Sequence, residues 1–265
     1  MGALRFKLDP DGEFVDSNAK MATPPWTSLR DLEYACLQLE RNDIPDDPQY
    51  AKWLQMLIVQ GSSLGGARPK ANVMDNRGNL WIAKFPSRND SKDVGAWEKV
   101  TNVLAKNCGI EMPESDTRCF LSKQHTYLSK RFDRNNDGSR IHFASAMTLL
   151  GLTDGADHTE GISYLALVEL LLMHGNELDK NLEQLWRRIV FNIAVSNCDD
   201  HLRNHGFLLT PGGWVLPHLQ VCLRIGRSGV DAAEHLSARA DIADYVLDSS
   251  PAGADRKGSN HTSKV

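Results

Sequence analysis

Apolar residues recur at helical spacing in several segments of the chain. In the first segment Leu32, Ala35, Cys36 and Leu39 share one face of a predicted helix over residues 28–39, because positions three or four apart lie on the same side of an α-helix. The other predicted helices span residues 50–59, 92–108, 162–173 and 179–195.

Two of these helices have patterns that predict how they pack. The helix over residues 92–108 has an apolar stripe that is expected to face the core, and Gly109 is expected to end it. The stripe consists of Val94, Trp97, Val100, Val103 and Leu104. Residues 162–173 are apolar on nearly every side, which predicts a helix buried in the centre of its lobe.

Strands are predicted mainly in the first half of the chain. They span residues 2–7, 70–74, 80–85, 117–121 and 125–132, with a further short hairpin over residues 207–216. Residues 75–79 have the residue types of a hairpin turn between two of these strands. The pattern therefore predicts a β-rich first part and a mainly helical second part.

Composition narrows the class of protein. A chain of 265 residues with 41% hydrophobic and 24% charged residues can form one large soluble domain or two lobes. A net charge of −4 does not favour direct nucleic-acid binding, and the most apolar stretch is too short to span a membrane. The cysteines include no C-x-x-C pair, so we expect a reducing cytoplasm and neither a disulfide framework nor a thiolate zinc site.

The densest group of chemically active residues lies between the last long helix and the final hairpin. Residues 196–209 bring carboxylates, amides and imidazoles together in one connection. Asp199 and Asn204 stand five apart, the spacing of the catalytic base and the metal-binding amide in the H-R-D-x-x-x-x-N loop of kinases, whereas Asp200 is one residue too close. Aspartate, asparagine and glycine are also ordinary turn formers. The alternative is that this segment only connects the helix to the strand that follows and has no catalytic role.

A second group surrounds the first strand pair. Glycines and hydroxyls in residues 61–67 precede Lys70, a composition that lets backbone N–H groups approach phosphate, although the pattern is neither a Walker A loop nor G-x-G-x-x-G. Lys84 lies on the next strand, and Glu98 on the helix after it could pair with it, as the equivalent residues do in kinases. The alternatives to these roles are a flexible turn at residues 61–67, a solvated Lys84 and an exposed Glu98.

Four motifs, in this order along the chain, resemble those of the HipA family of bacterial toxin kinases. They are residues 63–70 (SLGGARPK), 83–86 (AKFP), 130–134 (KRFDR) and 196–207 (SNCDDHLRNHGF). The resemblance implies an α+β, two-lobed protein-kinase-like fold. We expect a nucleotide-binding lobe over residues 1–133, a partial helical lobe over 134–225, and a poorly ordered tail over 226–265.

The resemblance also implies roles for individual residues. The residues implied to contact ATP are Gly65, Gly66, Ala67, Lys70 and Lys84 at the phosphates, and the backbone of Lys130, Arg131 and Phe132 at the adenine. Asp199 is implied to accept the proton of the substrate hydroxyl, His201 to support its loop, and Asn204 to bind Mg²⁺. Ser63 matches a serine whose autophosphorylation ejects the glycine loop and silences the family's enzymes.

At both ends the chain departs from the family pattern. Family members have a further N-terminal subdomain, and after the hairpin they read approximately S-P-A-Y-D-L-N-P, in which the aspartate binds Mg²⁺. Here Pro217 and His218 follow Leu216, and the next aspartate is Asp231. We expect a frameshift near Leu216 and much reduced activity; a gene without an S-P-A-Y-D-L reading in another frame would contradict the frameshift.

The leading prediction is a serine/threonine protein kinase of a toxin–antitoxin system. By resemblance its substrate is a protein, of which a glutamate-charging aminoacyl-tRNA synthetase is one example in the family, and its partner is a small HipB-like DNA-binding antitoxin. The first alternative is a non-catalytic remnant that binds nucleotide or the antitoxin. The second is a small-molecule phosphotransferase. A zinc site at His201 and His205 is disfavoured because no partner ligands are evident.

Overall fold

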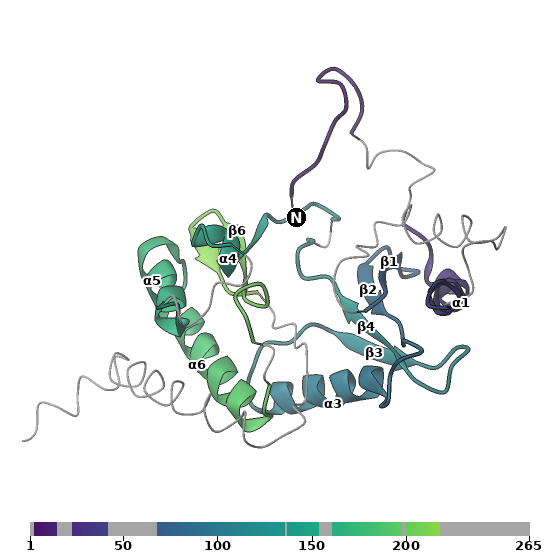
Figure 1. Ribbon diagram of the computed structural model, residues 1–265. Helices are drawn as coiled ribbons and strands as arrows, with labels where there is room; N and C mark the ends of the chain where they lie inside the picture. Colours follow the sequence, from purple (N-terminus) through teal and green to yellow (C-terminus); the bar gives the residue numbers. More distant parts are fainter. Residues whose placement is uncertain are drawn as a thin grey trace, which may run out of the picture. The chain divides into compact units, whose positions relative to one another are not determined.

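The described part of the chain forms two compact units. The computed structural model describes residues 3–14, 23–41, 68–135, 137–153, 161–197 and 200–217 (Figure 1). The first unit comprises residues 1–104 and 112–142, and the second comprises residues 105–111 and 143–265. The helix predicted over residues 50–59 and the tail predicted over 226–265 lie outside the described residues.

The first unit contains an antiparallel sheet of four strands in the order β1-β2-β4-β3. Its strands are β1 (Lys70–Met74), β2 (Leu80–Lys84), β3 (Ser115–Arg118) and β4 (Thr126–Lys130). The prediction of a strand over residues 2–7 is wrong. Among the described residues, this segment forms a single bridge, Lys7 to Phe14, and its Leu4 and Phe6 are exposed, so no neighbouring strand buries them.

One face of this sheet is apolar and is covered by α1 (Leu29–Leu39). The buried cluster consists of Leu29, Leu32, Ala35, Cys36, Ala71, Val73, Trp81, Ala83, Phe85 and Leu128. Alternate residues of each strand point to this face, as the period of two requires. Glu33 of α1 is also buried, and its carboxylate accepts hydrogen bonds from Leu121 N, Ser122 N and Thr126 Oγ1, which compensate for its burial.

The other face of the sheet is polar, and it meets α3 (Val94–Asn107). The helix buries Glu98, Thr101 and Asn102. The predicted packing of its apolar stripe is therefore wrong, since Trp97, Val100, Val103 and Leu104 are 44–47% exposed. The reason is that the sheet presents Lys84, Tyr127 and Ser129 on this side, and polar helix residues bond to polar strands more favourably than leucine or valine would.

The β1–β2 hairpin is held by Asp75, as its turn residues predict. The Asp75 carboxylate accepts hydrogen bonds from Arg77 N, Asn79 N, Asn79 Nδ2 and Trp81 Nε1 at 2.8–3.0 Å. Partial burial would raise the pKa of this carboxyl, but the four hydrogen bonds outweigh burial and lower the pKa to about 2.

This lowered pKa predicts acid sensitivity of the hairpin. Because the pKa of Asp75 falls from 3.8 to about 2 on folding, its stabilising contribution is complete above pH 3.8 and is lost as the pH falls toward 2. Allowing for solvent screening, we expect the loss to be about 1 kcal/mol in the free energy of unfolding. Urea unfolding at pH 6 and pH 2.5 should show a smaller pH dependence in Asp75→Asn. An equal dependence in both proteins would contradict the assignment.

The second unit combines a three-stranded sheet with helices. Its strands β5 (Phe143–Ser145), β6 (Gly206–Thr210) and β7 (Gly213–Val215) pair in the order β5-β6-β7. Its helices are α4 (Ala146–Leu149), α5 (Tyr164–His174) and α6 (Leu178–Ala194), so the helices predicted over residues 162–173 and 179–195 are confirmed. The predicted α+β division, β-rich first and mainly helical second, is confirmed.

The core of this unit lies between α5, α6 and the short sheet. It consists of Ala146, Leu167, Val168, Leu170, Leu171, Leu185, Ile189, Phe207 and Leu216. Burial of α5 on every side is not observed, since Leu172 and Met173 near its end are 59% and 69% exposed. Searched over the described segments alone, the helices include none with the length and hydropathy required to cross a bilayer.

Candidate active site

The first group of predicted site residues includes an ion pair between β2 and α3. Lys84 is the last residue of β2, and its Nζ lies 2.7 Å from Glu98 Oε2. The two side chains are only 12% and 7% exposed, so the ion pair is well shielded from solvent. Lys84 Nζ also lies 5.6 Å from the centroid of the Tyr127 ring. The contact proposed from sequence between Lys84 and Glu98 is present in the structure.

Lys70 lies directly opposite Lys84 in the sheet. The two residues are Cα partners in the β1–β2 ladder, and directly opposed residues point to the same face. Two like charges in this position repel each other, and Glu98, paired with Lys84, offsets part of the repulsion. The pair therefore creates a surface suited to phosphate oxygens.

The glycine loop itself lies outside the described residues. Ser63, Gly65, Gly66 and Ala67 fall within the range 42–67, which the structure does not describe. Their predicted roles stay predictions. Arg68, two residues before Lys70, is the first residue after this range that the structure describes.

The segment proposed to contact adenine follows β4 and is held rigidly. Lys130 N donates to Glu114 O and Arg131 N donates to Leu80 O, both at 2.9 Å. These two N–H groups are therefore already used, and any adenine contact from residues 130–132, including Phe132, must use other backbone atoms.

Beside it, Asp133 is the centre of a buried charge cluster. Its carboxylate receives two hydrogen bonds from the Arg131 guanidinium, at 2.8 and 2.6 Å, and lies 2.9 Å from Arg134 Nη1. Burial would raise the pKa of Asp133, but the hydrogen bonds and charge of Arg131, with the charge of Arg134, hold it below its usual value. Arg131 also donates to Asn72 Oδ1, which ties this segment to β1.

The second group of predicted site residues lies in the loop between α6 and β6 of the second unit. The loop starts at Ser196, whose φ of 52° is a left-handed conformation rare for a residue with a side chain. Asn197 N donates to Asn192 O at 2.9 Å. Cys198 and Asp199 lie outside the described residues, so the role of Asp199 as base stays a prediction.

Asp200 points into the core beneath this loop. Its side chain is 4% exposed, and its Oδ2 accepts hydrogen bonds from the Tyr164 hydroxyl and, at 2.8 Å, from Asn192 Nδ2. His205 Nε2 lies 2.9 Å from Oδ1, in ion-pair contact but without the alignment of a good hydrogen bond. Sequence reasoning missed Tyr164, Asn192 and the structural role of His205, since nothing in their spacing shows that they converge.

The other predicted residues of this loop lie nearer its surface. His201 is exposed, and its carbonyl oxygen accepts a hydrogen bond from Asn204 N at 2.8 Å. The imidazole that packs beneath the loop is that of His205, which is 2% exposed. A supporting role for His201 and a metal-binding role for Asn204 stay predictions.

The described residues were compared with the ligands that a metal ion requires. No group of three histidine, cysteine, aspartate or glutamate residues able to hold a metal is found in the part of the chain that the structure describes. Asp200 is close to Asn204 in sequence, but its carboxylate is already engaged by Tyr164 and Asn192. Among the residues of this loop that the structure describes, Asn204 is the one that the family resemblance names as a Mg²⁺ ligand, and that role stays a prediction.

A buried arginine lies under the end of β7. Arg188 of α6 is 2% exposed and donates from Nη2 to Pro217 O. Burial lowers the pKa of Arg188 to about 10, so it remains cationic at neutral pH. This hydrogen bond, together with the one from Leu216 N to Asn181 Oδ1, anchors the end of the hairpin to α6.

Comparison with known proteins identifies the family. A family model described as the HipA-like C-terminal domain matches residues 62–218. The chain belongs to this family. The match spans more than half of the chain and includes both groups of predicted site residues, so the resemblance inferred from the four motifs is confirmed.

Individual relatives of this HipA-like chain are distant. A Haemophilus influenzae protein, provisionally named a kinase, is 26% identical over 167 residues, which are 56% of this chain and 48% of the relative. The chain thus spans about half the length of this relative. A Shewanella oneidensis HipA, solved with HipB and operator DNA, aligns with a TM-score of 0.49 and 24% identity over 61% of this chain and 43% of its own. The Helicobacter pylori proinflammatory kinase CtkA aligns with a TM-score of 0.46 and 17% identity, over 67% and 63% respectively.

Proposed function

We propose that this chain is the catalytic core of a HipA-like serine/threonine protein kinase, which transfers the γ-phosphoryl group of ATP to a protein hydroxyl. The observation that carries the proposal is the buried Lys84–Glu98 ion pair, with Lys70 opposite Lys84 on the same face of the sheet. In kinases a lysine on the corresponding strand, paired with a helix glutamate, contacts the nucleotide phosphates.

In this proposal each residue has a distinct role. Lys70 and Lys84 bind and neutralise phosphate oxygens of ATP, while Glu98 holds the Lys84 ammonium in place. Asp199 accepts the proton of the attacking hydroxyl. The inward-facing Asp200 supports this assignment, because its carboxylate is bonded to Tyr164 and Asn192 and cannot also face a substrate. Most of the rate enhancement in phosphoryl transfer comes from such positioning and charge neutralisation.

A second candidate function is a kinase remnant that binds nucleotide without transferring phosphate. The observation favouring it is that Pro217 and His218 follow Leu216, where the family pattern places a metal-binding aspartate after the hairpin. When bound in kinases, magnesium bridges the phosphates and neutralises developing charge. A chain that holds it poorly would keep nucleotide affinity through its lysines and lose most of its rate.

The cellular context is proposed from family membership. We propose a protein substrate, with an aminoacyl-tRNA synthetase as the first to test, and a HipB-like antitoxin as partner. We also propose a cytoplasmic location, since ATP and both of these proteins are found there.

Transfer of radiolabelled phosphate from ATP to a general protein substrate tests the proposal. Transfer by the wild-type protein that disappears in Asp199→Ala is the result expected of a kinase. ATP binding, measured by isothermal titration calorimetry, with no transfer indicates the remnant. Absence of both contradicts a nucleotide-dependent function. Glu183→Gln, at an exposed position on α6, is a matched control that should retain the wild-type rate.

A further inference from the structure

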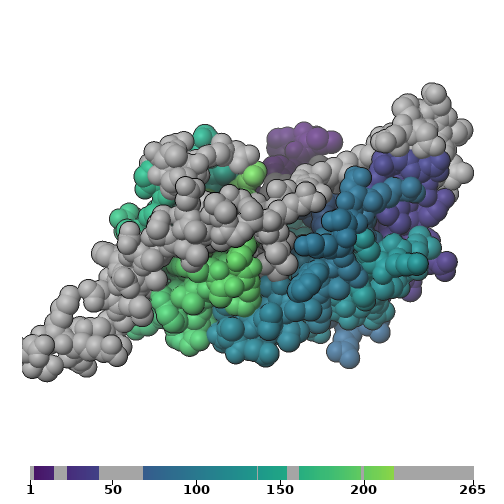
Figure 2. Space-filling view, turned by 60° about the horizontal axis from the view of Figure 1, so that its bottom comes forward, coloured from purple at the N-terminus to yellow at the C-terminus, as the bar shows by residue number. Residues whose placement is uncertain are grey.

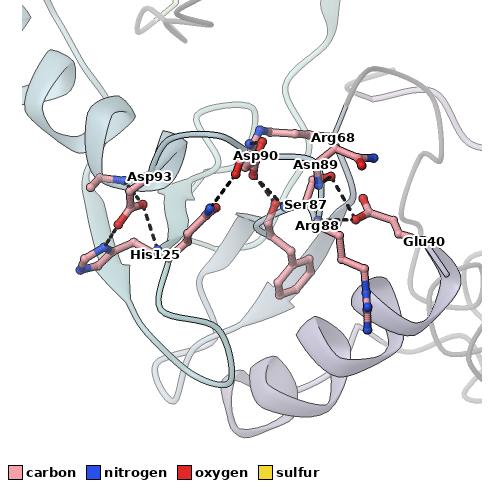
Figure 3. A network of polar contacts seen from close by, with 11 residues as sticks. Glu40, Arg68, Ser87, Arg88, Asn89, Asp90, Asp93 and His125 are labelled. Carbon is pink, nitrogen blue, oxygen red and sulfur yellow. Dashed lines mark hydrogen bonds and ion pairs between the residues drawn. The ribbon is translucent and has the colours of Figure 1, made fainter.

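Arg68 joins the beginning of β1 to the segment after β2. Its Nη1 donates to Phe85 O at 3.1 Å, and its Nη2 pairs with Asp90 Oδ1 (Figure 3). The side chains of Arg68 and Asp90 are only 18% and 13% exposed. The other carboxylate oxygen of Asp90 accepts a hydrogen bond from Ser87 N at 2.8 Å. Both oxygens of Asp90 are therefore used in fixing this connection.

Asp90 is itself held in place from two sides. Gln124 Nε2, in the β3–β4 turn, donates to Asp90 O at 3.1 Å. On the other side Glu40 Oε2 accepts hydrogen bonds from Ser87 Oγ and Arg88 N, at 3.0 and 2.7 Å (Figure 3). The aspartate thus belongs to a fixed polar network that spans α1, the segment after β2 and the β3–β4 turn.

This network lies next to the lysine pair. Phe85 N donates to Pro69 O at 3.0 Å, one position beyond the Lys70–Lys84 pair. The remaining pairs of the β1–β2 ladder need no such support, because they join neutral residues. At the Lys70–Lys84 end, repulsion between the two ammonium groups acts to separate the strands, although Glu98 beside Lys84 reduces it. A charge-assisted arginine–carboxylate contact at that end opposes the separation.

We infer that Asp90, acting through Arg68, is a positioning residue that keeps Lys70 and Lys84 together for phosphate binding. Neither Asp90 nor Arg68 needs to touch the nucleotide. The inference rests on the proposed function, because the lysine pair is taken as the phosphate-binding surface. It predicts that loss of the Asp90 charge weakens binding of ligands that carry phosphate and leaves binding of a ligand without phosphate unchanged.

Isothermal titration calorimetry with ADP and with adenosine tests this inference. Asp90→Asn keeps the size of the side chain and removes its charge. We expect it to weaken ADP binding about tenfold, as expected for loss of a charge-assisted hydrogen bond, and to leave adenosine binding unchanged. Arg68→Ala combined with Asp90→Ala should weaken ADP binding no more than either change alone, since the two residues act as one unit.

Asp116→Asn is the matched control. Asp116 pairs with Arg118 at 3.2 Å on β3 of the same sheet, but these side chains are 46% and 51% exposed, so the change should alter neither affinity. Equal weakening of ADP and adenosine binding by Asp90→Asn would indicate general loss of structure and overturn the inference, as would unchanged ADP binding. A wild-type protein that binds no ADP overturns the proposed function, and the inference falls with it.

Discussion

Replacing Lys84 by alanine is expected to weaken ATP binding by about 100-fold. The ammonium group at the end of β2 is the best-shielded cation on the proposed phosphate surface, and its removal also leaves Glu98, 7% exposed, without the ion-pair partner that lies 2.7 Å away. Loss of a shielded charge contact to phosphate is worth about 3 kcal/mol, which corresponds to this factor. Titration calorimetry with ATP measures the change directly.

The same substitution is expected to destabilise the first unit, and this effect must be separated from the loss of binding. An unpaired buried carboxylate costs about 3 kcal/mol in the free energy of unfolding. Lys84→Met combined with Glu98→Gln removes both charges, so it should restore most of the stability without restoring ATP binding. Recovery of binding in this double variant, or wild-type affinity in Lys84→Ala, would exclude Lys84 from the nucleotide site.

Asp200→Ala is expected to lower the free energy of unfolding of the second unit by about 3 kcal/mol. The substitution removes the acceptor of the Tyr164 hydroxyl and the Asn192 amide, and the carboxylate in contact with His205. Buried polar groups left without partners each cost about 1–3 kcal/mol. Guanidinium unfolding followed by tryptophan fluorescence measures the loss. Ala146 N donates to His205 O at 2.7 Å, so faster hydrogen exchange at this N–H would show that the loss of stability lies in the second unit.

Two comparisons make the Asp200 prediction specific. Asp179→Asn, at an exposed position in the first turn of α6, should change stability by no more than about 0.5 kcal/mol. Asp199→Ala should abolish phosphate transfer, if transfer occurs, with little change in stability. A stable, inactive Asp200→Ala together with an unstable Asp199→Ala would reverse the roles proposed for the two aspartates.

The orientation of α3 shows where sequence patterns stop being informative. Helical periodicity placed Trp97, Val100, Val103 and Leu104 on one side of the helix, and the structure agrees that they share a side. The pattern could not tell which side faces the sheet, because that depends on the polarity of strands elsewhere in the chain. Since Lys84 and Tyr127 line the facing surface, Glu98 and Asn102 are buried and the apolar stripe is exposed. The blue surface at the lower edge of Figure 2 belongs to the part of the chain around residue 100, which includes α3.

Among the candidate site residues, too, one contact could be predicted from the sequence and another could not. The Lys84–Glu98 contact could be predicted because a strand and the helix that follows it are neighbours in the chain, and because protein kinases pair a lysine and a glutamate at the equivalent positions. The partners of Asp200 could not be predicted, because the Tyr164 hydroxyl that reaches it belongs to a different helix, 36 residues earlier. The sequence places two aspartates side by side, and only the fold shows that Asp200 is buried against Tyr164 and Asn192.

By itself, then, the sequence determined the strands of the β1–β2 hairpin, the long helices, the family and the lysine that faces Glu98. These features depend on short-range spacing, turn chemistry and motifs that lie within a few residues of one another. Only the tertiary structure decided which face of α3 is buried, that Asp200 is a core residue, and that Arg68 reaches Asp90 beside the lysine pair. Each of these depends on contacts between segments distant in sequence, where packing and the pairing of buried charges outweigh local preference.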